Sequence, residues 1–190
     1  KEHVNGICDL IIEKGYDLNI WAYARVNTVN RELLLKLRDA GFKWLAYGIE
    51  SGNNKVLKSV TKGITIEKTK EIIKLTQDIG INVIGNYIFG LPEDNLQSME
   101  DTLDLAIELN CEFANIYCAT AYPGSSLYTQ ALEEGWKLPD TWVGYSPYSY
   151  EHLPIQTKYL SSSDVLRFRD DAYVRYYGNE RYQKMVEEKF

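Results

Sequence analysis

Tyr47-Gly48-Ile49-Glu50-Ser51-Gly52 is a strand-like run that ends in a polar, glycine-bearing turn, and the same arrangement recurs twice along the chain. The second copy reads Ile88-Phe89-Gly90-Leu91-Pro92-Glu93, and the third reads Ala121-Tyr122-Pro123-Gly124-Ser125. Parallel βα folds form their ligand sites at the carboxyl edge of the sheet, where strands lead into helices. The three turns therefore predict one shared site rather than three unrelated loops.

Strand and helix signals alternate on both sides of these turns. Apolar periodicity predicts helices that alternate with strands, and the strands are expected over residues 18–26, 42–49, 81–89 and 113–120. Asn30 and Thr65 are placed to cap two of the helices, while Gly41 and Gly80 follow helix ends at matching positions of a repeated pattern. Repeated αβ units imply parallel strands joined by right-handed crossovers.

The number of βα units sets the fold class. Four units are too few for a closed eight-stranded barrel, which takes about 250 residues. We therefore expect an α/β fold, a partial TIM-type (β/α) barrel of four parallel strands with a C-terminal helical extension. Such a fold should leave an unpaired sheet edge beside the first strand.

A change of composition after Gly135 divides the chain into two expected regions, a partial barrel over 1–135 and an aromatic-rich strap with C-terminal helices over 136–190. We interpret the strap as irregular chain packed on the barrel, because aromatic side chains bury large areas. A cap over a substrate is the alternative. Ser163 or Asp164 is expected to cap a terminal helix that reaches Tyr177, with a short helix over 180–188 after it.

Charge and hydropathy exclude several partners. The net charge of −6 and the isoelectric point of about 5.1 oppose nucleic-acid binding, which normally uses a basic face. The longest apolar runs fall far short of the roughly 20 residues of a membrane helix, so no membrane partner is expected. Residues 1–5 lack the apolar core of a secretory signal, which favours a cytoplasmic protein.

The cysteines and histidines give no sign of a metal site or a catalytic set. Cys8, Cys111 and Cys118 lack the close spacing of zinc or iron–sulfur ligands, and we interpret them as reduced thiols in apolar surroundings. His3 and His152 lie outside the strand ends. These residues therefore predict no metal ligand and no catalytic acid, base or nucleophile.

Strand parity instead predicts a polar lumen, because alternate side chains of a strand point to opposite faces. The polar residues expected inside the barrel are Arg25, Glu50, Asn86 and Asn115. A cation, a carboxylate and amides suit a zwitterionic or polyhydroxylated ligand. Structural alternatives remain for each group. Arg25 and Glu50 can form an ion pair between strands, Asn86 can be a satisfied core amide, and Ser51 can cap the following helix.

These turns resemble those of the radical S-adenosylmethionine (SAM) enzymes, in particular the branch that often carries a cobalamin-binding domain upstream. The matching stretches are Ala24-Arg25-Val26-Asn27, Gly48-Ile49-Glu50-Ser51-Gly52 with Lys62-Gly63 after it, Gly90-Leu91-Pro92-Glu93, and Tyr122-Pro123-Gly124-Ser125-Ser126-Leu127-Tyr128. Each stretch is short. Their order on four consecutive strands, followed by Tyr148-Ser149-Tyr150-Glu151, makes the combination specific, and the resemblance covers nearly the whole chain.

The resemblance implies a fold, two cofactors and a set of ligand contacts. In that family a (β/α)6 barrel holds a 4Fe-4S cluster that binds SAM, and an electron from a flavodoxin or ferredoxin cleaves SAM to a 5′-deoxyadenosyl radical. By resemblance, Arg25, Glu50 and Ser51 match positions that contact the methionine or ribose part of SAM. The turns Gly90-Leu91-Pro92 and Tyr122-Pro123 match segments that border the adenine. Asn86 joins the set by strand parity alone.

The chain departs from the family because the cluster motif, C-x-x-x-C-x-x-C, is missing. We therefore expect a C-terminal part of the enzyme that starts after the second of six barrel strands, with its cluster ligands outside this chain. This part should be inactive alone. The full-length protein would act on a small-molecule substrate, and methyl transfer with cobalamin is one of the outcomes that the resemblance allows.

Two other functions stay open at this point. A barrel enzyme without a metal could bind phosphate at the Gly48–Gly52 turn, since glycine-rich turns at helix starts bind anions, although Glu50 in that turn would repel phosphate. A barrel retained only as an interaction module is the non-enzymatic alternative.

Overall fold

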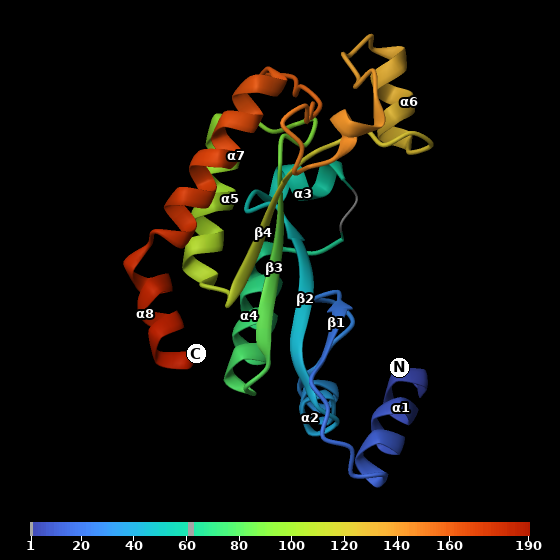
Figure 1. Cartoon of the computed structure of the whole chain (residues 1–190), viewed down its shortest axis with the longest axis vertical. Coiled ribbons are helices and arrows are strands. Elements are labelled where there is room, and N and C mark those ends of the chain that lie inside the picture. Colours follow the sequence, from blue (N-terminus) through green and yellow to red (C-terminus); the bar gives the residue numbers. More distant parts are fainter. Residues whose placement is uncertain (1, 61–62) are drawn as a thin grey trace.

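The computed structural model of the protein describes residues 2–60 and 63–190 and contains one open four-stranded sheet (Figure 1). The strands are β1 (Ile20–Ala24), β2 (Phe42–Glu50), β3 (Asn82–Phe89) and β4 (Phe113–Cys118). All pairings are parallel and follow the order β1-β2-β3-β4. The predicted α/β fold, with four parallel strands of an unclosed barrel, is confirmed.

Helices separate the strands and follow the last of them. They are α1 (Glu2–Glu13), α2 (Arg31–Asp39), α3 (Asn54–Ser59), α4 (Ile66–Asp78), α5 (Leu96–Leu109), α6 (Ser126–Glu133), the 3-10 turn η1 (Trp142–Tyr145), α7 (Ser162–Tyr177) and α8 (Glu180–Lys189). The six-residue α3 was not predicted. β1 ends earlier than predicted because the amide and hydroxyl of Thr28 both donate to the carbonyl of Arg25 and turn the chain.

The helix caps agree with the sequence at two helices and differ at a third. The side chains of Asn30 and Thr65 each accept the amide three residues further on, as predicted. The prediction for α7 was wrong, since its cap is Ser161 rather than Ser163 or Asp164. Ser161 and Asp164 form a reciprocal capping box in which Asp164 accepts the backbone amide of Ser161.

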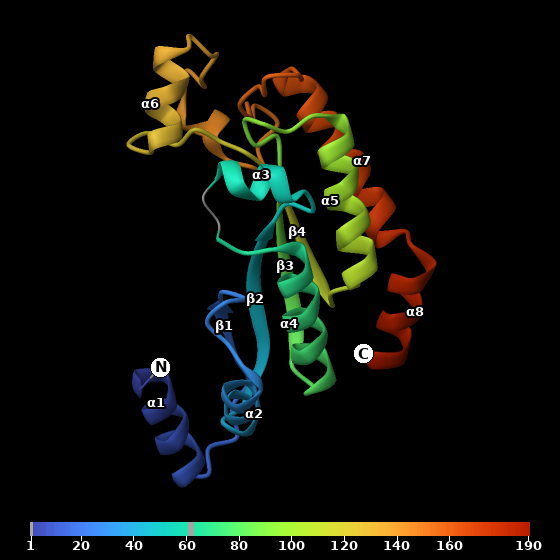
Figure 2. The same cartoon turned by 180° about the vertical axis from the view of Figure 1, so that it is seen from behind.

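The two faces of the sheet differ in burial. On β3 the side chains of Val83, Tyr87 and Phe89 are at most 1% exposed, whereas the residues between them are only partly buried, apart from Gly85. Helices α4 and α5 cover the buried face, behind the sheet in Figure 1 and in front of it in Figure 2. Helix α7 packs against β4 and adds Phe168 and Tyr176 to the same core. The other face, which we call the open face, carries Asn86 and Asn115, two of the four polar residues that strand parity predicted.

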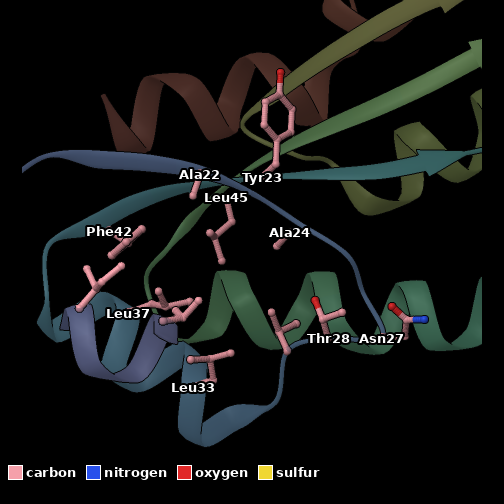
Figure 3. A pocket seen from close by; sticks show the side chains of 12 residues that line it. Ala22, Tyr23, Ala24, Asn27, Thr28, Leu33, Leu37, Phe42 and Leu45 are labelled. Atoms are coloured by element: carbon pink, nitrogen blue, oxygen red, sulfur yellow. The ribbon is translucent and has the colours of Figure 1, made fainter. Parts of the chain in front are cut away.

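β1 forms one edge of the sheet, as the sequence predicted, and an apolar cleft of about 450 Å³ lies beside it. Figure 3 shows Ala22 and Ala24 pointing into this cleft, on the side of Leu33 and Leu37 of α2. Tyr23, which lies between the two alanines, points the opposite way. The close-up therefore displays the alternation of faces that the strand pattern implies.

The chain after α7 returns to the amino-terminal ends of the strands. Lys189 forms a salt bridge with Glu112, whose side chain is 3% exposed and whose carboxylate also accepts the amide of Val83. The ring of Phe190 stacks on Trp44 of β2 with 5.9 Å between ring centroids. Within residues 2–60 and 63–190, no helix combines the length and apolarity needed to cross a membrane.

Gly41→Ala is expected to destabilise the chain more than the matched variant Gly80→Ala. Both glycines have φ of +90°, a backbone conformation that costs an L-residue roughly 1–2 kcal/mol. A Cβ at Gly41 would also lie 2.6 Å from the carbonyl oxygen of Leu18, whereas a Cβ at Gly80 meets nothing within 4 Å. Urea unfolding of both variants measures the difference, and equal losses of stability would contradict this account.

Candidate functional site

The turn after β2 leaves the regular strand geometry at Glu50. Glu50 has φ of +67°, and the β2–β3 register shifts between Gly48 and Glu50. This bulge interrupts the simple alternation from which the orientation of Glu50 was predicted. Glu50 is partly buried, and Lys62, the basic residue of the same motif, lies outside the described residues.

Ser51 is buried inside this turn rather than exposed at its surface. Ser51 is 1% exposed, and its hydroxyl oxygen lies 3.1 Å from the hydroxyl oxygen of Thr102 on α5. The Ser51 oxygen also accepts the amide of Asn53 at 3.1 Å. The alternative in which Ser51 caps the next helix was wrong, because the cap of α3 is Asn53.

Gly52 brings the same turn into direct contact with α5. A Cβ at this position would lie 2.3 Å from the carbonyl oxygen of Asp101, so only glycine allows the approach. The Gly52 amide donates to the hydroxyl of Thr102 at 2.9 Å. The position of the turn after β2 is therefore set by a helix that follows β3.

The turn after β3 is organised by a buried carboxylate that the sequence analysis missed. Asp94 is 1% exposed and accepts the Leu91 amide at 2.9 Å and the Ser98 hydroxyl at 2.6 Å. Burial raises the pKa of Asp94 to about 6, while the Ser98 hydroxyl and the amides of Leu91 and Gly90 act in the opposite direction. Gly90 has φ of +77°, and a Cβ there would lie 2.4 Å from Val165 of α7.

Two amide side chains cross the open face below these turns. Asn115 of β4 donates to the side-chain oxygen of Asn86 at 2.9 Å, and Asn86 donates to the carbonyl of Tyr47 at 3.1 Å. Gly48 is the register partner of Asn86, so no side chain of β2 occupies that place. Asn86 is thus a hydrogen-bonded amide, as the structural alternative held, and it is also partly exposed on the open face.

The remaining predicted residues lie at the ends of the two edge strands. Arg25 follows β1 and is exposed, and the ion pair between Arg25 and Glu50, which was the structural alternative, stays a hypothesis. Tyr122 and Pro123 follow β4, where Tyr122 is 49% exposed and its ring lies 6.2 Å from that of Tyr145 in the strap. The structure therefore joins the turns after β2 and β3 closely, with the predicted edge residues on either side.

The aromatic strap reaches the open face at one point. The rings of Tyr148 in the strap and Tyr117 of β4 lie 6.4 Å apart in an edge-on arrangement. Burial and the neighbouring Tyr148 hydroxyl raise the pKa of Tyr117. Tyr117 shares its strand face with Asn115, so the strap borders the same side of the sheet as the amide pair.

The three cysteines do not fit a 4Fe-4S cluster. Cys8, Cys111 and Cys118 are at most 4% exposed, and burial raises the pKa of each thiol, to about 12 for Cys111 and Cys118. Cluster ligands are thiolates, and burial of these three thiols opposes their ionisation. In the part of the chain that the structure describes, no three His, Cys, Asp or Glu side chains gather as a metal site.

Asp94, Ser98 and Thr102 are the site residues that the sequence analysis missed. The one local signal was the sequence Asp94-Asn95 followed by Ser98, which is typical of a helix start. The structure shows that Asn95 caps α5 in a capping box with Ser98. The contact of Thr102 with the turn after β2 has no local signal.

Comparison with known proteins places this geometry in a family. A family model described as the Radical SAM superfamily matches residues 9–106, just over half of the chain. An uncharacterized methyltransferase of Pyrococcus horikoshii is 27% identical over 168 residues, which are 88% of this chain and 36% of that protein. Bacteriochlorophyllide d C-8(2)-methyltransferase of Chlorobaculum tepidum is 29% identical over 78% of this chain and 35% of its own length. The chain spans about a third of these relatives.

Solved structures agree on the fold. The radical SAM methyltransferase TsrM from Kitasatospora setae, with cobalamin and a 4Fe-4S cluster bound, matches with a TM-score of 0.63 at 18% identity, over 70% of this chain and 26% of that chain. Elp3 from the archaeon Methanocaldococcus infernus matches with a TM-score of 0.56 at 15% identity, over 90% of this chain and 42% of that chain. At these identities the likeness shows the fold alone.

Asp94 should make the stability of the chain depend on pH between about 4 and 6. When the pKa of a carboxyl is higher in the folded than in the unfolded protein, the protonated carboxyl stabilises the folded state. This stabilisation is complete at pH values below the pKa of the unfolded protein, and it is lost as the pH rises through the pKa of the folded protein. The stability of the wild type relative to Asp94→Asn should therefore fall as the pH rises from about 4 to about 6.

Urea unfolding at several pH values measures this difference, with Asp140→Asn, at an exposed carboxylate, as the control for a lost charge. A stability of the wild type relative to Asp94→Asn that rises with pH over this range would contradict a raised pKa at Asp94.

Proposed function

The chain belongs to the radical SAM superfamily, and we propose that it forms the part of a radical SAM enzyme that binds S-adenosylmethionine at the carboxyl edge of its sheet. The observation that supports this most is that α5 hydrogen-bonds both the turn after β2 and the turn after β3, which follow neighbouring strands, and that the Asn86–Asn115 amide pair lies on the open face. These turns and amides stand where parallel βα folds bind their ligands.

The donors and acceptors at this edge suit the groups of S-adenosylmethionine. Its methionine part carries an amine and a carboxylate, and its ribose carries two hydroxyls. We assign the Arg25 guanidinium to the carboxylate, since guanidinium–carboxylate pairs are strong and directional. We assign the Glu50 carboxylate to the amine or the ribose hydroxyls, and Asn86 to a polar group deeper in the lumen.

The other predicted residues act through shape and backbone. Gly90 and Leu91 are buried at the turn after β3, and their backbone with Tyr122 and Pro123 would border the adenine. The buried hydroxyl of Ser51 already bonds to Thr102 and Asn53, so we assign Ser51 to holding the turn rather than to touching the ligand. This proposal replaces the contact with the methionine or ribose part that the resemblance implied for Ser51.

The iron–sulfur chemistry belongs to residues outside this chain. A bound 4Fe-4S cluster would supply the electron that cleaves S-adenosylmethionine, and this chain's residues would position the cofactor and exclude water. Because the three thiols do not fit a cluster, the ligands must come from elsewhere in the full-length protein. We propose that the full-length protein is a cytoplasmic enzyme of small-molecule substrates, reduced by a flavodoxin or ferredoxin, and inactive as this chain alone.

A methyl-transfer reaction with cobalamin is the finer proposal. Two relatives named above are called methyltransferases, and the TsrM structure holds cobalamin. The aromatic strap, which meets the open face at Tyr148 and Tyr117, is then placed to border the substrate.

The phosphate-binding alternative loses support from the geometry of the turn after β2. The amides of Gly52 and Asn53 already donate to Thr102 and Ser51, so they are not available to cradle an anion. Glu50 in the same turn would repel phosphate.

The full-length protein, reconstituted anaerobically with iron and sulfide, should show the visible absorption of a 4Fe-4S cluster and cleave S-adenosylmethionine when reduced with dithionite. The 190-residue chain alone should do neither, because it lacks the C-x-x-x-C-x-x-C motif and no set of metal ligands gathers among its described residues. Absence of both properties in the full-length protein would favour the non-catalytic interaction module instead.

Asn86→Ala should weaken binding of S-adenosylmethionine to the reconstituted protein about 5- to 10-fold, the scale of one or two lost hydrogen bonds. Asn82→Ala is the matched control, since Asn82 lies on the same face of β3 but at its amino end. Calorimetry measures both affinities. Equal effects of the two substitutions would place the ligand elsewhere.

A further inference from the structure

One face of α5 is hydrogen-bonded to both turns of the candidate site. Ser98 and Thr102 lie four residues apart, so their side chains share this face one helical turn apart. We propose that Thr102 and the Asp94–Ser98 pair are positioning residues that hold the turns after β2 and β3 in one fixed relation for ligand binding. This inference rests on the proposed function.

The hydrogen bonds among Asp94, Ser98, Thr102 and the two turns form one network, and its first half fixes the turn after β3. The Asp94 carboxylate accepts the Leu91 amide with one oxygen and the Ser98 hydroxyl with the other. The Asp94 amide in turn donates to the Leu91 carbonyl at 2.8 Å. Leu91 is therefore bonded to Asp94 in both directions, and Asp94 is bonded to α5.

The second half fixes the turn after β2, and its hydrogens can be assigned. The Thr102 hydroxyl donates to the carbonyl of Ser98 at 2.8 Å. Its oxygen is then free to accept, and the Gly52 amide and the Ser51 hydroxyl are the two donors that reach it, at 2.9 and 3.1 Å. The Ser51 oxygen accepts the Asn53 amide. Each hydroxyl thus donates once and also accepts.

The polar side chains of the network are buried, which gives it rigidity, whereas Gly52 and Asn53, whose amides bond to them, are half-buried. Asp94, Ser51 and Thr102 are each 1% exposed, and Ser98 is 4% exposed. A buried donor that loses its partner cannot turn to water, so each bond constrains the backbone more than an exposed bond would. Because one helix face carries both halves, neither turn can shift relative to the other without breaking a hydrogen bond to α5.

The central variant is Thr102→Val, which keeps the shape of the side chain but removes the acceptor of the Gly52 amide. Thr102→Ser restores the hydroxyl. The matched control is Thr76→Val, because Thr76 is also fully buried and its hydroxyl also bonds a second hydroxyl, that of Tyr47 at 3.0 Å, on the covered face of the sheet. Both valine variants should lower the melting temperature to a similar extent.

Two measurements on the reconstituted full-length protein test the inference. The first is the affinity for S-adenosylhomocysteine, a probe that cannot be cleaved, measured by calorimetry. The second is hydrogen exchange of the Gly52 amide, compared with that of the Tyr87 amide in the core of β3. Thr102→Val should raise the dissociation constant of the probe about tenfold, which is the scale of one lost hydrogen bond. It should also speed hydrogen exchange of the Gly52 amide but not of the Tyr87 amide. Thr102→Ser and Thr76→Val should stay within about twofold of the wild type in affinity.

The outcomes separate this inference from the proposed function. A wild-type protein that does not bind the probe refutes the proposed function. If the wild type binds the probe and Thr102→Val binds it with unchanged affinity, the positioning role alone is refuted. The same conclusion follows if Thr76→Val weakens binding as much as Thr102→Val does. Unchanged exchange at Gly52 in Thr102→Val also overturns it, because the amide would then not depend on that hydroxyl.

Discussion

The candidate site depends on the close contact between the turn after β2 and helix α5. Gly52 approaches α5 so closely that any side chain would collide with its backbone, and the Gly52 amide finds its partner in the buried hydroxyl of Thr102. This contact places Glu50 and Ser51 relative to a helix that begins after β3. The same helix holds the turn after β3 through Ser98. The order of the strands only brings the two turns near each other. Their hydrogen bonds to α5 hold them in a fixed relation.

The second constraint is the unequal covering of the sheet. Parallel sheets usually have both faces covered, either by helices or by closure into a barrel. Here α4, α5 and α7 cover one face, and the open face carries the Asn86–Asn115 amide pair, with Ile88 and Tyr117 between this pair and the carboxyl ends of the strands. Toward the amino ends it is apolar, with a hollow of about 290 Å³ lined by Trp21, Trp44, Ile84 and Phe113.

Local patterns in the sequence were sufficient to predict most of the fold. Strand alternation, the caps Asn30 and Thr65, and the glycine turns at Gly41 and Gly80 each depend on a few neighbouring residues, and the structure has all of them. The failure at Ser161 was also local, because three serines precede Asp164 and the sequence does not say which one starts the helix.

The arrangement of the site could be predicted only in part. The strand-end turns were found because glycine and proline mark them, and the amide pair was found by parity. The burial of Ser51 and the bonds of Thr102 could not be predicted, since they join residues about fifty positions apart through tertiary packing. Asp94 was missed because a carboxylate in a turn is ordinarily exposed.

The most direct test is a structure of the full-length protein with S-adenosylmethionine bound. This account predicts the methionine part near Arg25 and Glu50, and the adenine against the backbone of Gly90 and Leu91, all on the open face. A ligand in the apolar cleft beside β1, or on the face covered by α4 and α5, would contradict it.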